Sequence, residues 1–243
     1  MIFGSDRPLF LRSVQFPKDL VLLVLAPHPD DFDEIGVTLR YFQDNGNPIY
    51  VDVLSSSAGG VEDSFCTPPT LEQKARVREK EQRDSCRFFG LPESHLIFLR
   101  LPEDAEGHIV ENQEAVERVR QRLVSKKPDL VFLPHGNDSN LGHQRAYSMF
   151  RKAASEFPRP ITSLLAKDPK TISMRNDLYT VFGPEKAEWK AELLRFHQSQ
   201  HQRNLNTRGY GFDERILRVN RQNARELSKN NMFAEVFEIQ YRP

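Results

Sequence analysis

Long apolar runs and cysteine are both scarce in this sequence of 243 residues. No stretch approaches the roughly 20 apolar residues that a membrane span needs, and the N-terminal sequence MIFGSDRPLFLRSVQF lacks the apolar core of a secretory signal. We therefore expect an unexported protein without a membrane span. The two cysteines, Cys66 and Cys86, form no CxxC pair, which excludes a disulfide framework and a thiolate zinc site. A reducing cytoplasm is the expected location.

An excess of charge of either sign is also missing. Lys plus Arg and Asp plus Glu both number 34, so no overall positive field would attract nucleic acid or an anionic membrane. We expect no nucleic-acid partner, although a local cluster of charge could still bind a small anion. The GxGxxG motif of dinucleotide-binding sheets is absent after residues 20–25, the first predicted strand. The composition is compatible with a monomer or a homo-oligomer.

The most informative stretch that is present covers residues 20–31 and has the sequence LVLLVLAPHPDD. Its six consecutive apolar residues predict a short strand that is buried on both faces of a parallel sheet. Two prolines then keep the chain extended, and His28, Asp30 and Asp31 lie in this stiff turn. The carboxyl end of a buried strand is where open α/β sheets bind ligands. A histidine and two carboxylates at this point therefore indicate a metal site.

Strands alternate with helices over residues 1–157, which predicts a doubly wound, mostly parallel α/β sheet flanked by helices. The elements predicted for this part are strands at 20–25, 49–54, 96–99 and 129–134, and helices at 33–45, 70–89, 111–126 and from about 142. The rhythm changes in residues 158–243, where we predict strands at 161–165, 178–182 and 233–239 and helices at 184–200 and 213–229. We interpret this second part as an elaboration of the same domain, so that residues 1–243 form a single domain.

A second group of polar side chains follows the strand predicted at 129–134. It contains His135, Asp138 and His143, the last of them at the start of the next predicted helix. Parallel strands end at the same edge of a sheet, so we expect this loop to lie beside the PHPDD turn. Asp138 is a turn residue in the simplest interpretation, but it could also position a ligand or the substrate.

The two loops together offer the ligands of a hydrolytic zinc site, which needs three protein ligands and an open position for water. His28, Asp31 and His143 supply two imidazoles and one carboxylate. Asp30 then remains beside the ion as a general base for the bound water, whose pKa the ion lowers toward about 7. Asp30 or Asp31 could instead cap the helix that follows. Zinc is the expected cofactor, and affinity trends leave room for another divalent metal ion.

Two groups of arginines are also notable. Arg78 falls on the apolar face of a long predicted helix, and a buried arginine is costly unless it is paired. It therefore either holds a structural carboxylate or faces a site for an acidic or polar group, with Glu81 as one candidate partner. Arg203, Arg208 and Arg215 lie close together in the sequence; they are either solvated or paired, or they bind a substrate phosphate or carboxylate.

Taken in order, these motifs resemble the LmbE/PIG-L family of zinc-dependent de-N-acetylases. The shared features are PHPDD after an apolar strand, SAGG after the next strand, RxxE on the following helix and a GHQRA-type helix start after the fourth strand. The resemblance covers most of the first 150 residues and implies a Rossmann-like sheet. It also implies zinc bound by His28, Asp31 and His143, with Asp30 as the general base.

The resemblance further implies a substrate, namely a small molecule or conjugate that bears an N-acetylglucosaminyl group. GlcNAc-phosphatidylinositol and the precursors of mycothiol and bacillithiol are such substrates. Lys190 and the HQSQ sequence at 197–200 resemble a later K…H.SQ segment of the family. On this basis His197 joins Arg78 and Asp138 as a candidate substrate-binding residue, the alternative for His197 being a packing histidine.

Two positions depart from the family pattern. Phe32 stands where family members commonly carry glutamate, and Asn140 stands where a histidine that stabilises the tetrahedral intermediate is expected. The amide of Asn140 or the imidazole of His135 could take over as the oxyanion donor. The main hypothesis is hydrolysis of an N-acetyl amide to acetate and a free amine. The alternatives are a metal-dependent amidase for another N-acyl or non-sugar amide, and a non-catalytic protein that binds a metal or a sugar conjugate.

Overall fold

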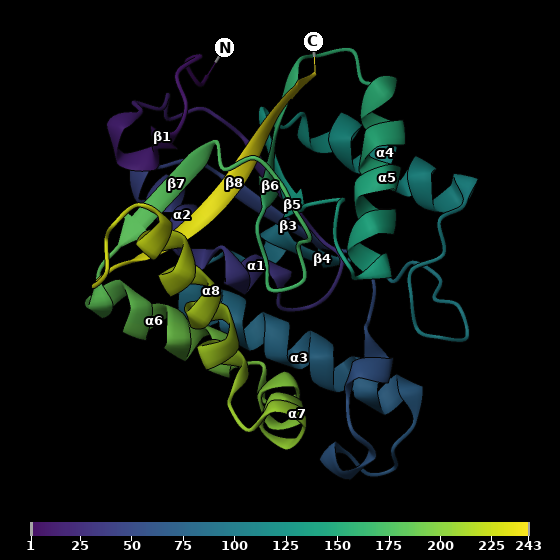
Figure 1. Cartoon of the computed structure of the whole chain (residues 1–243). Helices are drawn as coiled ribbons and strands as arrows, with labels where there is room; N and C mark the ends of the chain where they lie inside the picture. Colours follow the sequence, from purple (N-terminus) through teal and green to yellow (C-terminus); the bar gives the residue numbers. More distant parts are fainter. Residues whose placement is uncertain (1, 243) are drawn as a thin grey trace.

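A computed structural model describes residues 2–242 of the chain (Figure 1). Within this range one sheet has the strand order β1-β7-β8-β6-β5-β2-β3-β4. The strands are Leu9–Phe10 (β1), Leu22–Ala26 (β2), Ile49–Val53 (β3), Leu96–Phe98 (β4), Leu130–Pro134 (β5), Ile161–Ala166 (β6), Leu178–Phe182 (β7) and Phe233–Arg242 (β8). β8 is antiparallel to β6 and β7, and the other pairings are parallel. The predicted doubly wound, mostly parallel sheet is confirmed.

Helices connect most of these strands, and their ends follow local sequence signals. The α-helices are Asp31–Glu34 (α1), Gly36–Asn45 (α2), Leu71–Phe89 (α3), Gln113–Lys126 (α4), Leu141–Ser155 (α5), Pro184–Arg195 (α6), Gln198–Arg208 (α7) and Phe212–Glu226 (α8). At the start of α3 the Thr70 hydroxyl accepts a hydrogen bond from the Gln73 N–H group, and Gly90 ends this helix with a φ of 86°. No helix within residues 2–242 combines the length and the apolar character needed to cross a bilayer.

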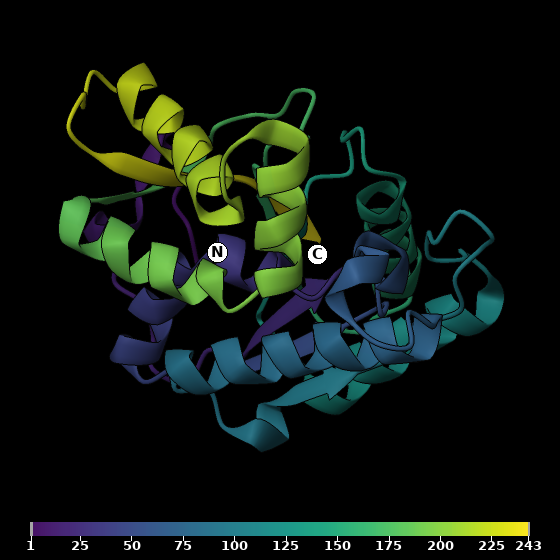
Figure 2. The same cartoon turned by 90° about the horizontal axis from the view of Figure 1, so that it is seen from below.

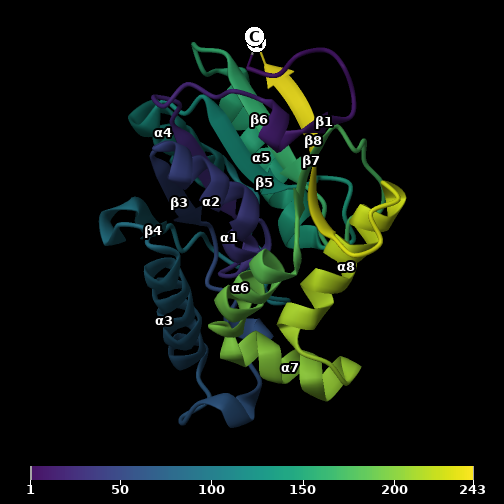
Figure 3. The ribbon, with the colours of Figure 1, turned by 90° about the vertical axis from the view of Figure 1, so that its left-hand side faces the viewer.

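Alternate residues of the central strands pack into two different layers. Leu22 and Val24 of β2 belong to a core shared with α2, α3 and α6, whereas Leu23 and Leu25 belong to a core shared with α4 and α5. This alternation explains why all five residues of β2 are apolar. Figure 1 shows α4 and α5 together on one side of the sheet, and Figure 3 shows α6, α7 and α8 gathered near α3 at one end.

The order in which strands are added to the sheet reverses at β2, although β2 and β5 themselves are parallel. From β2 the chain moves outward to β3 and β4, and it then returns to β5 and β6 on the other side of β2. The loops that leave the carboxyl ends of β2 and β5 therefore diverge, which opens a crevice for a ligand. These are the two loops that carry the predicted metal ligands.

Residues 184–200, predicted as one helix, instead contain α6 and the start of α7, which continues to Arg208; the two helices meet at His197. His197 is fully buried, and its Nε2 atom lies 2.7 Å from Asp33 Oδ2. Two residues later, the Ser199 hydroxyl donates a hydrogen bond to Glu81. Because these acidic partners belong to α1 and α3, the break in the helix serves contacts with the N-terminal half of the chain.

Candidate metal centre

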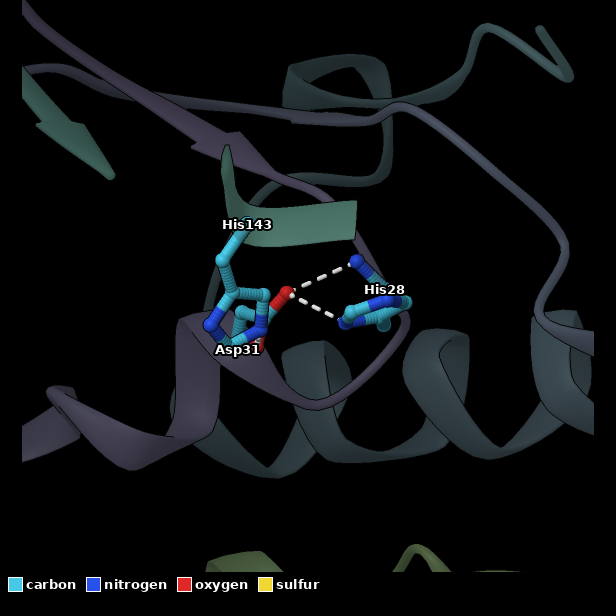
Figure 4. A group of neighbouring side chains, drawn as sticks. All are labelled: His28, Asp31 and His143. Atoms are coloured by element: carbon cyan, nitrogen blue, oxygen red, sulfur yellow. Dashed lines mark hydrogen bonds and ion pairs between the residues drawn. The ribbon is translucent and has the colours of Figure 1, made fainter. Parts of the chain in front are cut away.

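His28, Asp31 and His143 face one another at the carboxyl ends of β2 and β5 (Figure 4). One candidate ligand atom from each residue lies within 4.8 Å of the other two. His28 Nδ1 is 3.2 Å from Asp31 Oδ2, and His143 Nε2 is 3.4 Å from Asp31 Oδ1. Two imidazoles and a carboxylate form a donor set that suits zinc, so the three residues fit a metal ion.

Two further carboxylates hold the ring of His143 from its other side. His143 Nδ1 lies 3.2 Å from Asp138 Oδ2 and 3.3 Å from Asp168 Oδ2. A histidine held in this way has a fixed orientation and tautomer, which leaves its other nitrogen available to a metal ion. Asp138 is itself held by the backbone N–H group of Asn140, at 2.6 Å from its Oδ1 atom. Asp138 therefore positions a candidate ligand.

The charges of this cluster shift one another's protonation. Burial lowers the pKa of His143, but the carboxylates of Asp31, Asp138 and Asp168 outweigh burial and raise this pKa to about 10. Burial raises the pKa of Asp31, but His28 and His143 outweigh burial and hold this pKa well below its usual range. The cluster thus keeps a proton on His143 near neutral pH, and a metal ion has to displace that proton in order to bind.

The carboxylate of Asp30 lies next to the ligands but is held by Arg78. Arg78 Nη2 donates to Asp30 Oδ2 at 3.0 Å and also to the backbone carbonyl of Pro29. Arg78 is only 1% exposed, so the arginine on the apolar helix face does hold a carboxylate. Asp30 has a backbone φ of 143°, which residues other than glycine rarely adopt. The contacts of Arg78 help to offset this backbone strain.

Asn140 caps α5, three residues before the candidate ligand His143. Its Oδ1 atom accepts a hydrogen bond from the Gly142 N–H group at 2.9 Å, and its side-chain N–H groups have no hydrogen-bond partner in the described chain. A Cβ atom at Gly142 would lie 2.7 Å from His28 Nε2 and 3.1 Å from Asn140 Oδ1. Glycine at this position therefore allows α5 to approach His28 closely.

A cavity of about 770 Å³ opens over this group. It is lined by all three candidate ligands, by Asp30 and by Asn140. Its walls come from the loops after β3, β4, β5 and β6 and from α3, α7 and α8. Figure 2 views the molecule from the side on which α3, α6 and α7 lie. The arrangement leaves a candidate ion open to a substrate.

The structure places two predicted site residues away from this cavity. His135 Nδ1 accepts a hydrogen bond from the Asn137 N–H group at 2.9 Å, and His135 Nε2 lies 3.4 Å from Glu238. His197 is enclosed beside Asp33. Neither histidine is among the described residues that line the cavity. Both have the contacts of packing histidines.

Two acidic residues of the site are absent from the sequence prediction. Asp168 follows β6, which pairs with β5, and an acidic residue just past that strand was the available signal. Glu34 ends α1 and lines the cavity, and no pattern pointed to it. Burial and the nearby carboxylates of Asp168, Asp31 and Asp30 raise the pKa of Glu34 well above its ordinary value.

The fold and the site define a class of protein, namely Rossmann-like α/β proteins. In this class, candidate metal ligands of the histidine and aspartate type line a cavity at the switch point of the sheet. The family model described as PIG-L, GlcNAc-PI de-N-acetylase, matches residues 23–154, which include Asp30 and all three candidate ligands. The chain belongs to this family, and the resemblance inferred from the motifs is confirmed. A search of curated proteins found no significant match.

Solved structures with the same fold include two deacetylases and a hydratase. The N,N'-diacetylchitobiose deacetylase from Pyrococcus horikoshii has a TM-score of 0.71 and 17% identity, covering 90% of this chain and 83% of that one. The zinc-inhibited form of teicoplanin deacetylase has a TM-score of 0.70 and 16% identity, covering 91% and 98%. The 4-carboxy-2-hydroxymuconate hydratase from Pseudomonas putida has a TM-score of 0.62 and 15% identity, covering 92% and 97%.

Proposed function

We propose that this chain is a zinc-dependent hydrolase that removes the acetyl group from a small molecule or conjugate containing N-acetylglucosamine. The observation that carries the proposal is the carboxylate of Asp30 beside the open group of His28, Asp31 and His143, within one cavity. Membership of the PIG-L family supports the choice of reaction. Those three ligands would hold the ion, which when bound polarises the acetyl carbonyl and makes water more acidic.

In the reaction, water adds to the acetyl carbon, the carbon–nitrogen bond breaks, and acetate and a free amine are released. Asp30 accepts the proton of the attacking water and returns it to the leaving nitrogen. Arg78 fixes the direction of the Asp30 carboxylate through the 3.0 Å hydrogen bond. The side-chain N–H groups of Asn140 are available to stabilise the oxyanion, because Gly142 already occupies the oxygen of that amide.

The candidate substrate-binding residues divide into two groups on the basis of their contacts. Arg78 lines the cavity, its Nη1 atom lies 3.8 Å from Glu81 Oε2, and neither Nη1 nor Nε has a hydrogen-bond partner in the described chain. This spare donor capacity supports a contact with the substrate. For Asp138 and His197 we instead propose positioning roles, since Asp138 contacts His143 and His197 contacts Asp33.

Acetate release from N-acetylglucosaminyl conjugates, measured with and without a chelator, tests the reaction. We expect release that a chelator abolishes and added zinc restores. Since an amidase for another N-acyl group is the alternative, the panel also includes other N-acyl amides, and release from those alone would favour that amidase. No release from any amide by the metal-loaded protein would overturn the hydrolase.

Substitution of the proposed base separates catalysis from metal binding. Asp30→Asn should keep bound zinc and lose turnover by about 10²- to 10⁴-fold, because the proton of water loses its acceptor. His143→Ala should lose the zinc itself. Zinc content and acetate release are measured on the same samples, and Asp44→Asn, an exposed acid paired with Arg40, serves as the control. Normal turnover by Asp30→Asn would contradict the assignment.

A further inference from the structure

The part of the cavity formed by α7, α8 and the loop after β6 carries a cluster of positive charge. We call this cluster the cationic wall; it consists of Lys170, Arg203, Arg208 and Arg215. In the described chain none of the four has a carboxylate oxygen within ion-pair distance. The contacts of the arginines are weak and neutral: Arg203 donates to the Gly60 carbonyl at 3.4 Å, and Arg208 donates to Asn204 Oδ1 at 3.2 Å.

Two nearby arginines that do not line the cavity have acidic partners. Arg195 pairs with Asp213 at 2.7 Å, and Arg218 pairs with Glu214 at 2.6 Å. Although the whole chain has equal numbers of acidic and basic residues, residues 193–212 contain no acidic residue at all. Positive groups that share one wall repel one another unless an anion lies between them. No acidic residue of this segment balances the positive charge of the wall.

The charge of the cavity is divided by location. The acidic side chains of Asp30, Asp31, Glu34 and Asp168 line the end of the cavity with the candidate metal ligands, whereas the cationic wall lines it from α7, α8 and the loop after β6. Arg215 is half-buried and opposes the rise in the pKa of Glu34, so its charge acts on the acidic end. A substrate whose amide lies at the acidic end would present its remaining part to the wall.

We propose that the cationic wall binds an anionic group, a phosphate or a carboxylate, on the part of the substrate that does not react. Guanidinium groups form paired hydrogen bonds with both kinds of anion. The cavity volume of about 770 Å³ falls in the range of sites for small molecules larger than one sugar. The inference rests on the proposed deacetylase for the identity of the reacting end, and it selects acidic conjugates among the substrates of that enzyme.

Equilibrium binding tests the wall without turnover. The probes are N-acetylglucosamine 1-phosphate, an N-acetylglucosaminide with a carboxylated aglycone, and neutral methyl N-acetylglucosaminide, each titrated calorimetrically into the zinc-loaded Asp30→Asn protein. At low salt we expect at least one anionic probe to bind about tenfold or more tightly than the neutral one, with the preference shrinking as salt screens the charges. The two anionic probes distinguish phosphate from carboxylate. Equal binding of all three probes would overturn the proposal.

A triple variant assigns the preference to the wall. Arg203→Gln, Arg208→Gln and Arg215→Gln together should abolish the preference and leave the neutral probe bound within about twofold. The matched control replaces Arg76, Arg87 and Arg218, which are exposed and paired on the outer surface, and it should retain the preference. A preference that survives in the wall variant would show that the anion binds the metal ion, which also overturns the proposal.

Rates of acetate release keep this inference separable from the proposed reaction. In otherwise wild-type protein the wall variant should lower kcat/KM for an anionic conjugate by about tenfold or more and leave kcat/KM for the neutral one almost unchanged. If no conjugate releases acetate, the deacetylase fails while the binding experiment still decides the wall. If both conjugates react and neither depends on the arginines, the wall fails while the deacetylase stands.

Discussion

At the scale of single residues, Gly142 links the backbone of α5 to the metal group. Alanine at this position would favour the helix by about 1 kcal/mol, but its Cβ atom would lie 2.7 Å from His28 Nε2. Since the approach of α5 also places His143, one methyl group would disturb two candidate ligands. The requirement for glycine is therefore a requirement of the site.

We expect Gly142→Ala to lower zinc affinity by about tenfold or more, because displaced ligand orientation weakens metal binding. The metal-free variant should unfold at a temperature close to that of the metal-free parent. A zinc titration against a competing chelator measures the affinity. Gly59→Ala is the control, since Gly59 lines the same cavity and a Cβ atom there meets open space. Unchanged zinc affinity in Gly142→Ala would contradict the proposal that His28 binds the metal ion.

His143 predicts a pH dependence of the metal-free protein. Its pKa rises from 6.5 to about 10 on folding, despite burial, because of the carboxylates of Asp31, Asp138 and Asp168. The stabilisation that comes from a raised pKa is present in full below pH 6.5. It falls as the pH rises from 6.5 and is lost once the pH has passed about 10. Urea unfolding of chelated protein should show a fall of up to about 1.4 kcal/mol per pH unit in that window. His143→Gln should lack this part of the fall; an identical profile would contradict the prediction.

That the candidate ligands and Asp30, the proposed base, lie around one cavity could be predicted from the sequence because they lie in short motifs directly after predicted strands. His28, Asp30 and Asp31 are within four residues of one another. Glu81, the predicted helix partner of Arg78, does lie within ion-pair distance, with its Oε2 atom 3.8 Å from Arg78 Nη1. The closer partner, Asp30, could not be predicted, since it is 48 residues away. Such long-range pairs are decided by packing.

At the scale of elements, the N-terminus of α2 is capped by a residue from the distant strand β8. The Glu235 carboxylate accepts hydrogen bonds from the N–H groups of Val37 and Thr38, at 3.0 Å and 2.7 Å. Lys190 of α6 lies 2.7 Å from the same carboxylate and also donates to Asn220 of α8. This buried ion pair joins α2, α6, α8 and β8.

Removing one partner of this pair should destabilise the fold strongly. We expect Lys190→Met to lower the free energy of unfolding by about 3–5 kcal/mol, because Glu235 remains buried without its positive partner. The control Arg218→Met removes an exposed partner of Glu214 and should cost less than about 1 kcal/mol. Urea denaturation measures both variants. Equal, small effects would show that water replaces Lys190 at the carboxylate.

The bounds of buried strands follow from periodicity in both parts of the chain, whereas the breaks within helices depend on tertiary contacts. β7 has the predicted bounds, since a buried strand carries its own apolar signal. The division of α6 from α7 has no such signal, because the break depends on Ser199 and His197 meeting Glu81 and Asp33. The antiparallel direction of β8 likewise cannot be inferred from its composition.

At the scale of the whole molecule, we propose that the parts 1–157 and 158–243 form one domain. Trp189, the single tryptophan, lies in the second part and stacks on Phe88 of α3 with ring centres 6.3 Å apart. It also lies 6.0 Å from the ring of Phe89. Its fluorescence therefore reports on the contact between the two parts.

A single domain should unfold in one step. We expect the urea transitions followed by Trp189 fluorescence and by far-ultraviolet circular dichroism to coincide. A control protein with Phe88→Leu should shift both transitions together, because it weakens the contact between the two parts. A fluorescence transition that precedes the loss of helix would instead indicate that residues 158–243 detach as a separate unit.

The position of β8 has a consequence for synthesis on the ribosome. β8 follows every other strand in the sequence, yet it lies between β6 and β7. While the chain is being made, β6 has emerged with one edge unpaired, and β7 with β1 has no route to join the sheet. Unpaired edges of this kind invite association with other chains. The nascent protein is therefore most exposed to aggregation just before Phe233–Arg242 emerges.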